Sequence, residues 1–172
     1  MKSVIEKKAS RDGLIYYEYK PSIIKQFYVD LETISLRRRV RLLMAYFAGY
    51  TVYYIAEGNE YVGYCLVQNG SDRRYTFATS EDIIVGPYFI REDYRGRKLS
   101  ISLLKYVLYT AEINFKYAYD YIHKDNLPSI KASMAVGFKY MSDAKVSKLT
   151  RRISLCDSNT GEYLIFRLSK QW

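Results

Sequence analysis

The chain has 172 residues with 27 basic and 18 acidic side chains, a net charge of +9, and an apolar fraction of 49%, which predicts one folded domain and excludes intrinsic disorder. One histidine, two cysteines (Cys65 and Cys156) and the lack of CxxC or HExxH motifs exclude a disulfide framework and argue against a metal site. No apolar run approaches the roughly 18–20 residues of a membrane helix, and residues 1–11 are too polar for a signal peptide, so we expect a cytoplasmic protein.

The first part of the chain predicts a strand, two helices and a hairpin. The expected elements are a strand over residues 13–20, helices over 23–34 and 36–48, and strands over 51–56 and 61–67 joined by a loop at 57–60. Pro21 starts the first helical pattern and Gly49 ends the second. The apolar residues that we expect on the buried side of the second helix are Leu36, Val40, Leu43 and Phe47.

The rest of the chain alternates strands and helices before it ends in strands. The expected elements are a strand over 82–90, a helix over 99–113, a strand over 116–122, a short helix over 128–136, and extended segments over 138–148, 150–155 and 162–168. Gly86-Pro87 interrupts the first of these strands and indicates a bulge or a sheet edge. This order predicts a mixed α/β domain.

The turn before the helix at 99–113 carries the most informative chemistry. It reads Asp93-Tyr94-Arg95-Gly96-Arg97-Lys98-Leu99-Ser100. The first amide N–H groups of a helix have no intrahelical partner, and the helix dipole places partial positive charge there. Glycine lets an anion approach the backbone closely. With three basic side chains beside it, this junction predicts a site for a pyrophosphate.

This turn resembles the signature of the GNAT superfamily of N-acetyltransferases, which use acetyl-CoA and read Gln/Arg-x-x-Gly-x-Gly/Ala here. Arg95 and Gly96 match the family's Arg-Gly pair. Lys98 stands in place of a family glycine, and Ser100 in place of the last Gly/Ala.

A second element of the same family follows downstream. Asn126, Ser129 and the pair Gly137-Phe138 match its pattern. Ser133 stands where the family carries a tyrosine, which is often the acid that protonates the CoA thiolate. The two elements together, at this separation, support the resemblance more strongly than either alone.

The resemblance covers residues 50–140 by motif and the whole chain by element order. It implies a single α/β domain over residues 1–172, with a central mixed, mostly antiparallel sheet, a splay between two parallel middle strands, and about four flanking helices. The strand with the Gly86-Pro87 bulge would bind pantetheine, and an N–H near Ile90 would polarise the thioester. The implied acetyl-CoA contacts are Phe89, Ile90, Arg91, Arg95, Gly96, Arg97, Lys98, Leu99, Ser100, Asn126 and Ser129, with no metal.

Three residues are candidates for proton transfer, and each has a structural alternative. His123 follows the strand 116–122 at the mouth of the splay and suits proton transfer near neutral pH, or it is a loop histidine bonded to solvent. Glu81 opens the bulged strand, where family bases often lie, or it is a solvated acid. Ser133 holds the family's tyrosine position, although serine is shorter and a weaker acid. Tyr88 faces either the acceptor or the core.

Four arginines lie on the helix at 36–48, namely Arg37, Arg38, Arg39 and Arg41. The resemblance places this part of the chain along the acceptor site, so the arginines either steer an anionic acceptor or form a solvated face, which ranks first. Cys65 and Cys156 lie in strand patterns and are expected to pack in the core.

The resulting hypothesis is an acyl-CoA-dependent N-acyltransferase, most simply one that acetylates the amine of a small molecule by direct attack. An amino sugar or nucleotide sugar is the preferred acceptor. The alternatives are O-acylation, a longer acyl donor, and a non-catalytic module that binds CoA or nucleic acid. Residues 1–50 and 101–172 each carry an excess of +5, which attracts polyanions in general. Nucleic acid ranks below CoA, no membrane is expected, and a homodimer stays open.

Overall fold

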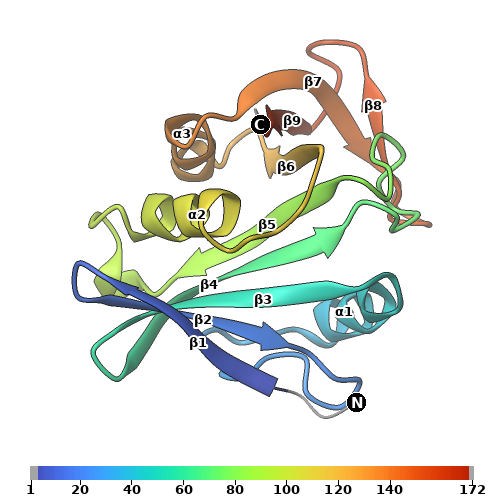
Figure 1. Cartoon of the computed structure of the whole chain (residues 1–172). Helices are drawn as coiled ribbons and strands as arrows, with labels where there is room; N and C mark the ends of the chain where they lie inside the picture. The colour runs from blue at the N-terminus through green and yellow to red at the C-terminus, as the bar shows by residue number, and fades with distance from the viewer. Residues whose placement is uncertain (1–3, 171–172) are drawn as a thin grey trace.

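The computed structural model describes residues 4–170, which form one nine-stranded sheet flanked by helices (Figure 1). The strands are β1 (Val4–Arg11), β2 (Leu14–Lys20), β3 (Tyr50–Glu57), β4 (Glu60–Asn69), β5 (Ile83–Ile90), β6 (Tyr117–His123), β7 (Lys139–Val146), β8 (Ile153–Cys156) and β9 (Tyr163–Ser169). The helices are α1 (Leu36–Ala48), α2 (Leu99–Tyr109), α3 (Leu127–Ala135) and the short 3-10 helix Glu92–Tyr94. No helix within residues 4–170 is long and apolar enough to cross a membrane.

The sheet splays open in its middle. Its order is β1-β2-β3-β4-β5-β6-β9-β7-β8, and only β5 and β6 run parallel. These two strands pair at Ile83–Ala118 and Ile84–Tyr119 and then separate, although β5 continues to Ile90. The expected mixed, mostly antiparallel sheet with a splay between parallel middle strands is confirmed.

A bulge in β5 marks the start of the splay. Cys65 of β4 pairs with Tyr88, whereas Val67 pairs with Val85, so Gly86 and Pro87 together face a single residue of β4. Gly86 has a φ of +105°, a conformation that favours glycine. The extra residue bends the strand away from its partner. The Gly86-Pro87 pair therefore produces the bulge that its sequence indicates.

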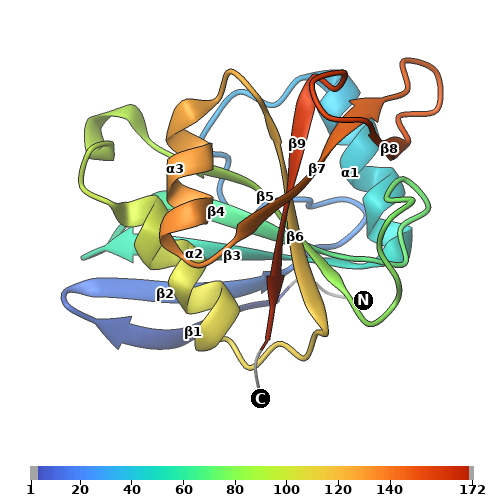
Figure 2. The ribbon, with the colours of Figure 1, turned by 90° about the horizontal axis from the view of Figure 1, so that it is seen from above.

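Helices cover both faces of the sheet. α2 and α3 pack on one face, over a core that includes Val62, Val85 and Leu103. α1 and the preceding loop pack on the other face, over Val52, Leu66 and several tyrosines. In both Figures 1 and 2, α1 lies at the right of the molecule and α2 and α3 lie at the left. The splay therefore has α1 on one side and α2 and α3 on the other.

The helix expected over residues 23–34 is absent, and a loop takes its place. Buried tyrosines of the sheet bond to the backbone of this loop. The Tyr54 hydroxyl accepts from the N–H of Tyr28 at 2.9 Å and donates to the Val29 carbonyl at 3.2 Å. The Tyr19 hydroxyl donates to the Lys25 carbonyl at 2.8 Å. The buried phenol hydroxyls and the backbone N–H and C=O groups of the loop are hydrogen-bond partners for one another. These loop groups therefore do not need the hydrogen bonds of a helix.

The buried side of α1 also differs from the prediction. Leu36 and Phe47 are each 77% exposed, whereas Leu42 and Ala45 are buried. Both sets recur at helical spacing, so the periodicity alone did not identify the side that faces the sheet. The outcome turns Arg38 and Arg41 toward the sheet, beside Leu42.

One strand was not expected, and one helix is shorter than expected. Residues 4–11, expected only to be polar, form the edge strand β1, whose Lys8 bridges Glu6 and Glu18 at 2.6 and 3.6 Å. α2 ends at Tyr109, four residues before the expected end.

Candidate active site

A cleft of about 370 Å³ opens on the α2–α3 side of the splay. The end of β5, the start of α2 and the start of α3 form its walls. Its lining residues are Tyr88, Phe89, Ile90, Arg95, Ser100, Asn126, Pro128 and Ser129. All but Tyr88 and Pro128 are among the predicted cofactor contacts, which lie far apart in the sequence.

The backbone of β5 offers an unpaired edge to this cleft. The Arg91 N–H donates to the Val62 carbonyl at 2.9 Å, and Ile90 lies opposite Gly63. Hydrogen-bonded and non-hydrogen-bonded pairs alternate along an antiparallel ladder, so the N–H and C=O of Ile90 point away from β4 and into the splay. The Arg95 guanidinium donates to that carbonyl at 3.2 Å.

The start of α2 has the geometry of an anion site. Gly96 has a φ of +79°, and a Cβ added there would meet nothing within 4 Å. Lys98 caps the helix in a left-handed conformation without a side-chain hydrogen bond to it. The first backbone N–H groups of α2 are therefore left for a ligand or for water.

Most basic side chains around this turn already have acidic partners. Arg95 pairs with Glu92 at 3.1 Å, and Arg97 pairs with Glu57 at the end of β3. Arg91 pairs with Glu60 at 2.8 Å on the far side of the turn. Lys98 has no ion pair among the described residues. The predicted cluster of positive charge is thus partly neutralised by the hairpin 57–60.

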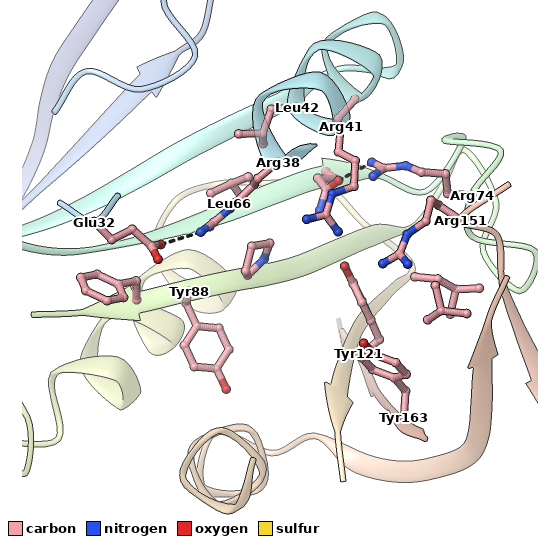
Figure 3. A pocket seen from close by; sticks show the side chains of 16 residues that line it. Glu32, Arg38, Arg41, Leu42, Leu66, Arg74, Tyr88, Tyr121, Arg151 and Tyr163 are labelled. Atoms are coloured by element: carbon pink, nitrogen blue, oxygen red, sulfur yellow. Dashed lines mark hydrogen bonds and ion pairs between the residues drawn. The ribbon is translucent and has the colours of Figure 1, made fainter. Parts of the chain in front are cut away.

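A second pocket of about 420 Å³ lies on the α1 side of the same splay (Figure 3). Its walls come from α1, β4, β5, β6, β9 and the loop between β7 and β8. Tyr88 and Phe89 line both this pocket and the cleft. The two cavities therefore meet at these two residues of β5, which are the common wall between them.

A buried acid lies at the root of the splay. Asp120 is the first residue of β6 beyond its pairing with β5, and it is 2% exposed. The Ser133 hydroxyl of α3 donates to it, and the Tyr88 hydroxyl lies 3.5 Å from Ser133 Oγ and donates to the Ser129 carbonyl at 2.9 Å. Burial raises the pKa of Asp120 to about 7, against the hydrogen bonds from Ser133 and the Tyr121 N–H, which lower it. Burial also raises the pKa of the Tyr88 phenol, which is protonated at neutral pH even at its ordinary value.

Several solved structures with a similar fold are acetyltransferases. IAA acetyltransferase from Bacillus cereus ATCC 14579 has a TM-score of 0.63 at 10% identity, over 98% of this chain and 99% of that one. A GNAT family acetyltransferase from Elizabethkingia anophelis with acetyl-CoA bound has a TM-score of 0.63 at 11% identity, over 92% and 99%. An acetyltransferase from Thermus thermophilus has a TM-score of 0.56 at 20% identity, over 80% and 77%. No protein-family model and no curated protein matches the sequence.

The chain has the GNAT fold.

Within this GNAT fold, the three residues predicted for proton transfer occupy different places. Ser133 is fully buried and bonds to Asp120. His123 ends β6 outside both cavities, with its ring 5.2 Å from that of Tyr163. Glu81 precedes β5 at the paired end of the splay and lies 3.7 Å from Lys116. Neither His123 nor Glu81 contacts the common wall at Tyr88.

Several other residues that the sequence predicts as acetyl-CoA contacts lie outside the cleft lining. Leu99 packs into the core below α2, and Arg91 and Arg97 point to acids of the hairpin. Gly96 and Lys98 shape the turn itself. Among the described residues, no group of three or more histidine, cysteine or acidic side chains has the geometry to hold a metal ion.

Sequence reasoning missed Asp120 and the arginines that come from outside α1. A carboxylate inside the otherwise apolar strand pattern of β6 was the available signal for Asp120. Arg74 and Arg151 carried no such signal, because they reach the pocket from two separate loops.

Proposed function

We propose that the protein is an acetyltransferase that moves an acetyl group from acetyl-CoA to the amine of a small molecule. The observation that carries this proposal is the meeting of two cavities at Tyr88 and Phe89. One cavity has the features of a CoA site, and the other has room for a separate small molecule. A carrier protein that only bound CoA would have no need for a second pocket behind the same wall.

The residues of the cleft fit an acyl-CoA. The Ile90 N–H and C=O face the cleft and would hydrogen-bond a pantetheine chain as an added strand. The uncapped start of α2, with Ser100 and Lys98, would hold the pyrophosphate. The Arg95 guanidinium donates to the Ile90 carbonyl in the structure. We expect this side chain to turn toward phosphate when pantetheine bonds to that carbonyl. Acetyl-CoA supplies the activated acetyl thioester.

Tyr88 is the proposed acid. In the reaction, the amine nitrogen bonds to the acetyl carbon and the carbon–sulfur bond breaks. The sulfur takes a proton from the Tyr88 phenol, and the nitrogen releases a proton to water, which returns one to the phenol. The Tyr88 phenol lies on the common wall and remains protonated at neutral pH. Its hydroxyl reaches Ser133, which holds the position of the family's tyrosine. A phenol from β5 thus replaces the phenol that the family pattern places on α3, and Ser133 and Asp120 position it.

The acceptor is proposed to be an amine, with an amino sugar or nucleotide sugar preferred. The alternative acceptor group is a hydroxyl, which would make the protein an O-acetyltransferase. The proposed location is the cytoplasm, where acetyl-CoA is available as the donor.

Two measurements test this function. Calorimetric titration with acetyl-CoA should show one site per chain and raise the melting temperature. A thiol-release screen over amines, amino sugars and alcohols, with acetyl-CoA as donor, should then reveal turnover with an amine. Absence of acetyl-CoA binding would refute the proposal outright. Binding without thiol release across the screen would favour a non-catalytic CoA-binding module, and release with alcohols alone would favour O-acetylation.

A further inference from the structure

The pocket on the α1 side is lined by four arginines and one glutamate. The arginines are Arg38, Arg41, Arg74 and Arg151, and the carboxylate is Glu32. They come from α1, from the turn after β4 and from the loop between β7 and β8, so three separate segments deliver positive charge to one cavity. Figure 3 shows Arg41, Arg74 and Arg151 converging on one end of the pocket, away from Tyr88.

Two of the four guanidinium groups are neutralised within the protein. Arg38 donates to Glu32 at 2.7 Å and to the Tyr64 hydroxyl at 2.5 Å. Arg74 binds Asp72 at 2.6 Å and also donates to Gln68 at 2.8 Å. Because both partners are largely buried, these pairs are fixed features of the wall.

Arg41 and Arg151 are different, since neither has an ion pair or a side-chain hydrogen bond with any residue from 4 to 170. The Arg41 Nε is buried and lacks a hydrogen-bond partner. Buried donors are almost always paired, and unpaired charges in a partly enclosed pocket are costly. This end of the pocket therefore holds two guanidinium groups that have no acidic partner among residues 4–170, and the Arg41 group includes a buried donor without a hydrogen bond.

Resting on the acetyltransferase function above, we propose that the acceptor is an amine that also carries an oxyanion group, a phosphate or a carboxylate, held by Arg41 and Arg151. Guanidinium groups bind both oxyanions through paired hydrogen bonds. Tyr88 and Phe89 line the opposite part of the same pocket, where the acetyl group would arrive. The anion at the arginine end thus orients the amine toward the common wall.

The four arginines of α1, Arg37, Arg38, Arg39 and Arg41, therefore lie on two different sides of the helix. Arg38 and Arg41 line the pocket, whereas Arg37 is exposed and Arg39 pairs with Asp30 at 3.2 Å on the outside. The solvated face that ranked first in the sequence accounts for Arg37 and Arg39 alone.

The inference has a test that does not require the acceptor to be known. Calorimetry would measure inorganic phosphate and acetate binding to the full chain at saturating CoA, which occupies the pyrophosphate site. We expect saturable phosphate or acetate binding that weakens at least tenfold in Arg41→Gln and in Arg151→Gln. The matched controls are Arg37→Gln on the same helix and Arg152→Gln on the same loop, both exposed, and they should bind as the native chain does.

Thermal melts of all four variants, and their CoA affinities, separate local loss of the anion from misfolding. If CoA binds but neither anion does, or if both pocket variants bind anions as the controls do, the inference is overturned while the acetyltransferase proposal stands. If CoA fails to bind, the proposed function fails first. If the pocket selects phosphate, glucosamine 6-phosphate should have a lower KM than glucosamine. If the pocket selects a carboxylate, the corresponding uronic acid should have a lower KM than glucosamine. Equal KM values for all three would also overturn the inference.

Discussion

Replacing Asp120 by asparagine tests the buried network at the root of the splay. Burial raises the pKa of Asp120 from 3.8 to about 7 in the folded chain. Between these values the native state holds a proton that the unfolded state has lost, so the free energy of unfolding falls as pH rises through this window and levels off above it. At about 1.4 kcal/mol per pKa unit, the effect amounts to about 4 kcal/mol.

Asp120→Asn removes the charge and keeps an oxygen that accepts from the Ser133 hydroxyl. Urea unfolding from roughly pH 4 to pH 8 measures the free energy of unfolding of both chains. The difference between them should shift by about 4 kcal/mol in favour of the variant as pH rises across that range. Asp143→Asn is the contrasting control, because the Tyr140 hydroxyl lowers the pKa of Asp143. Its replacement should cost stability at neutral pH and cost less as pH falls. A gap between Asp120→Asn and the native chain that is independent of pH would refute the raised pKa.

Three further predictions concern the tyrosines and the cofactor turn. Tyr88→Phe should lower kcat at least tenfold with little change in acetyl-CoA affinity. The control Tyr109→Phe also removes a hydrogen bond from a tyrosine to a backbone carbonyl near α3, but it should retain kcat. Equal losses of kcat in the two variants would remove Tyr88 from the chemistry. Tyr54→Phe should destabilise the fold by about 1–3 kcal/mol in urea unfolding, because two loop N–H groups and one carbonyl lose their partner; an unchanged midpoint would contradict this. Glu57→Gln should tighten acetyl-CoA binding at low salt by releasing Arg97, and an unchanged dissociation constant would show that Arg97 does not reach the phosphates.

The proposed cofactor side of the protein was readable from the sequence because its determinants are local. A bulge at Gly86-Pro87, an Arg-Gly turn and a helix that starts at Leu99 depend on backbone conformations that glycine and proline encode within a few residues. The proposed contacts Ser100 and Asn126 follow from the same local elements, since both lie at helix starts.

The proposed acceptor pocket depends on tertiary structure for the choice among the arginines that the sequence offered. α1 has two faces with helical spacing, and packing against the sheet chose the one that carries Arg41. The segment 23–34 forms a loop and not a helix, and its backbone bonds to the Tyr54 hydroxyl. A buried phenol hydroxyl needs a hydrogen-bond partner, and this loop supplies one.

The twenty tyrosines show the same division. Their number is evident from the sequence. The hydroxyl of a tyrosine lies far from its own backbone, so the position of the residue in the sequence says little about where the hydroxyl lies in the fold. The family pattern has a tyrosine where this chain has Ser133, and Tyr88 reaches the same place from β5. Only the separation of β5 from β6 brings that hydroxyl, Asp120 and the two cavities together.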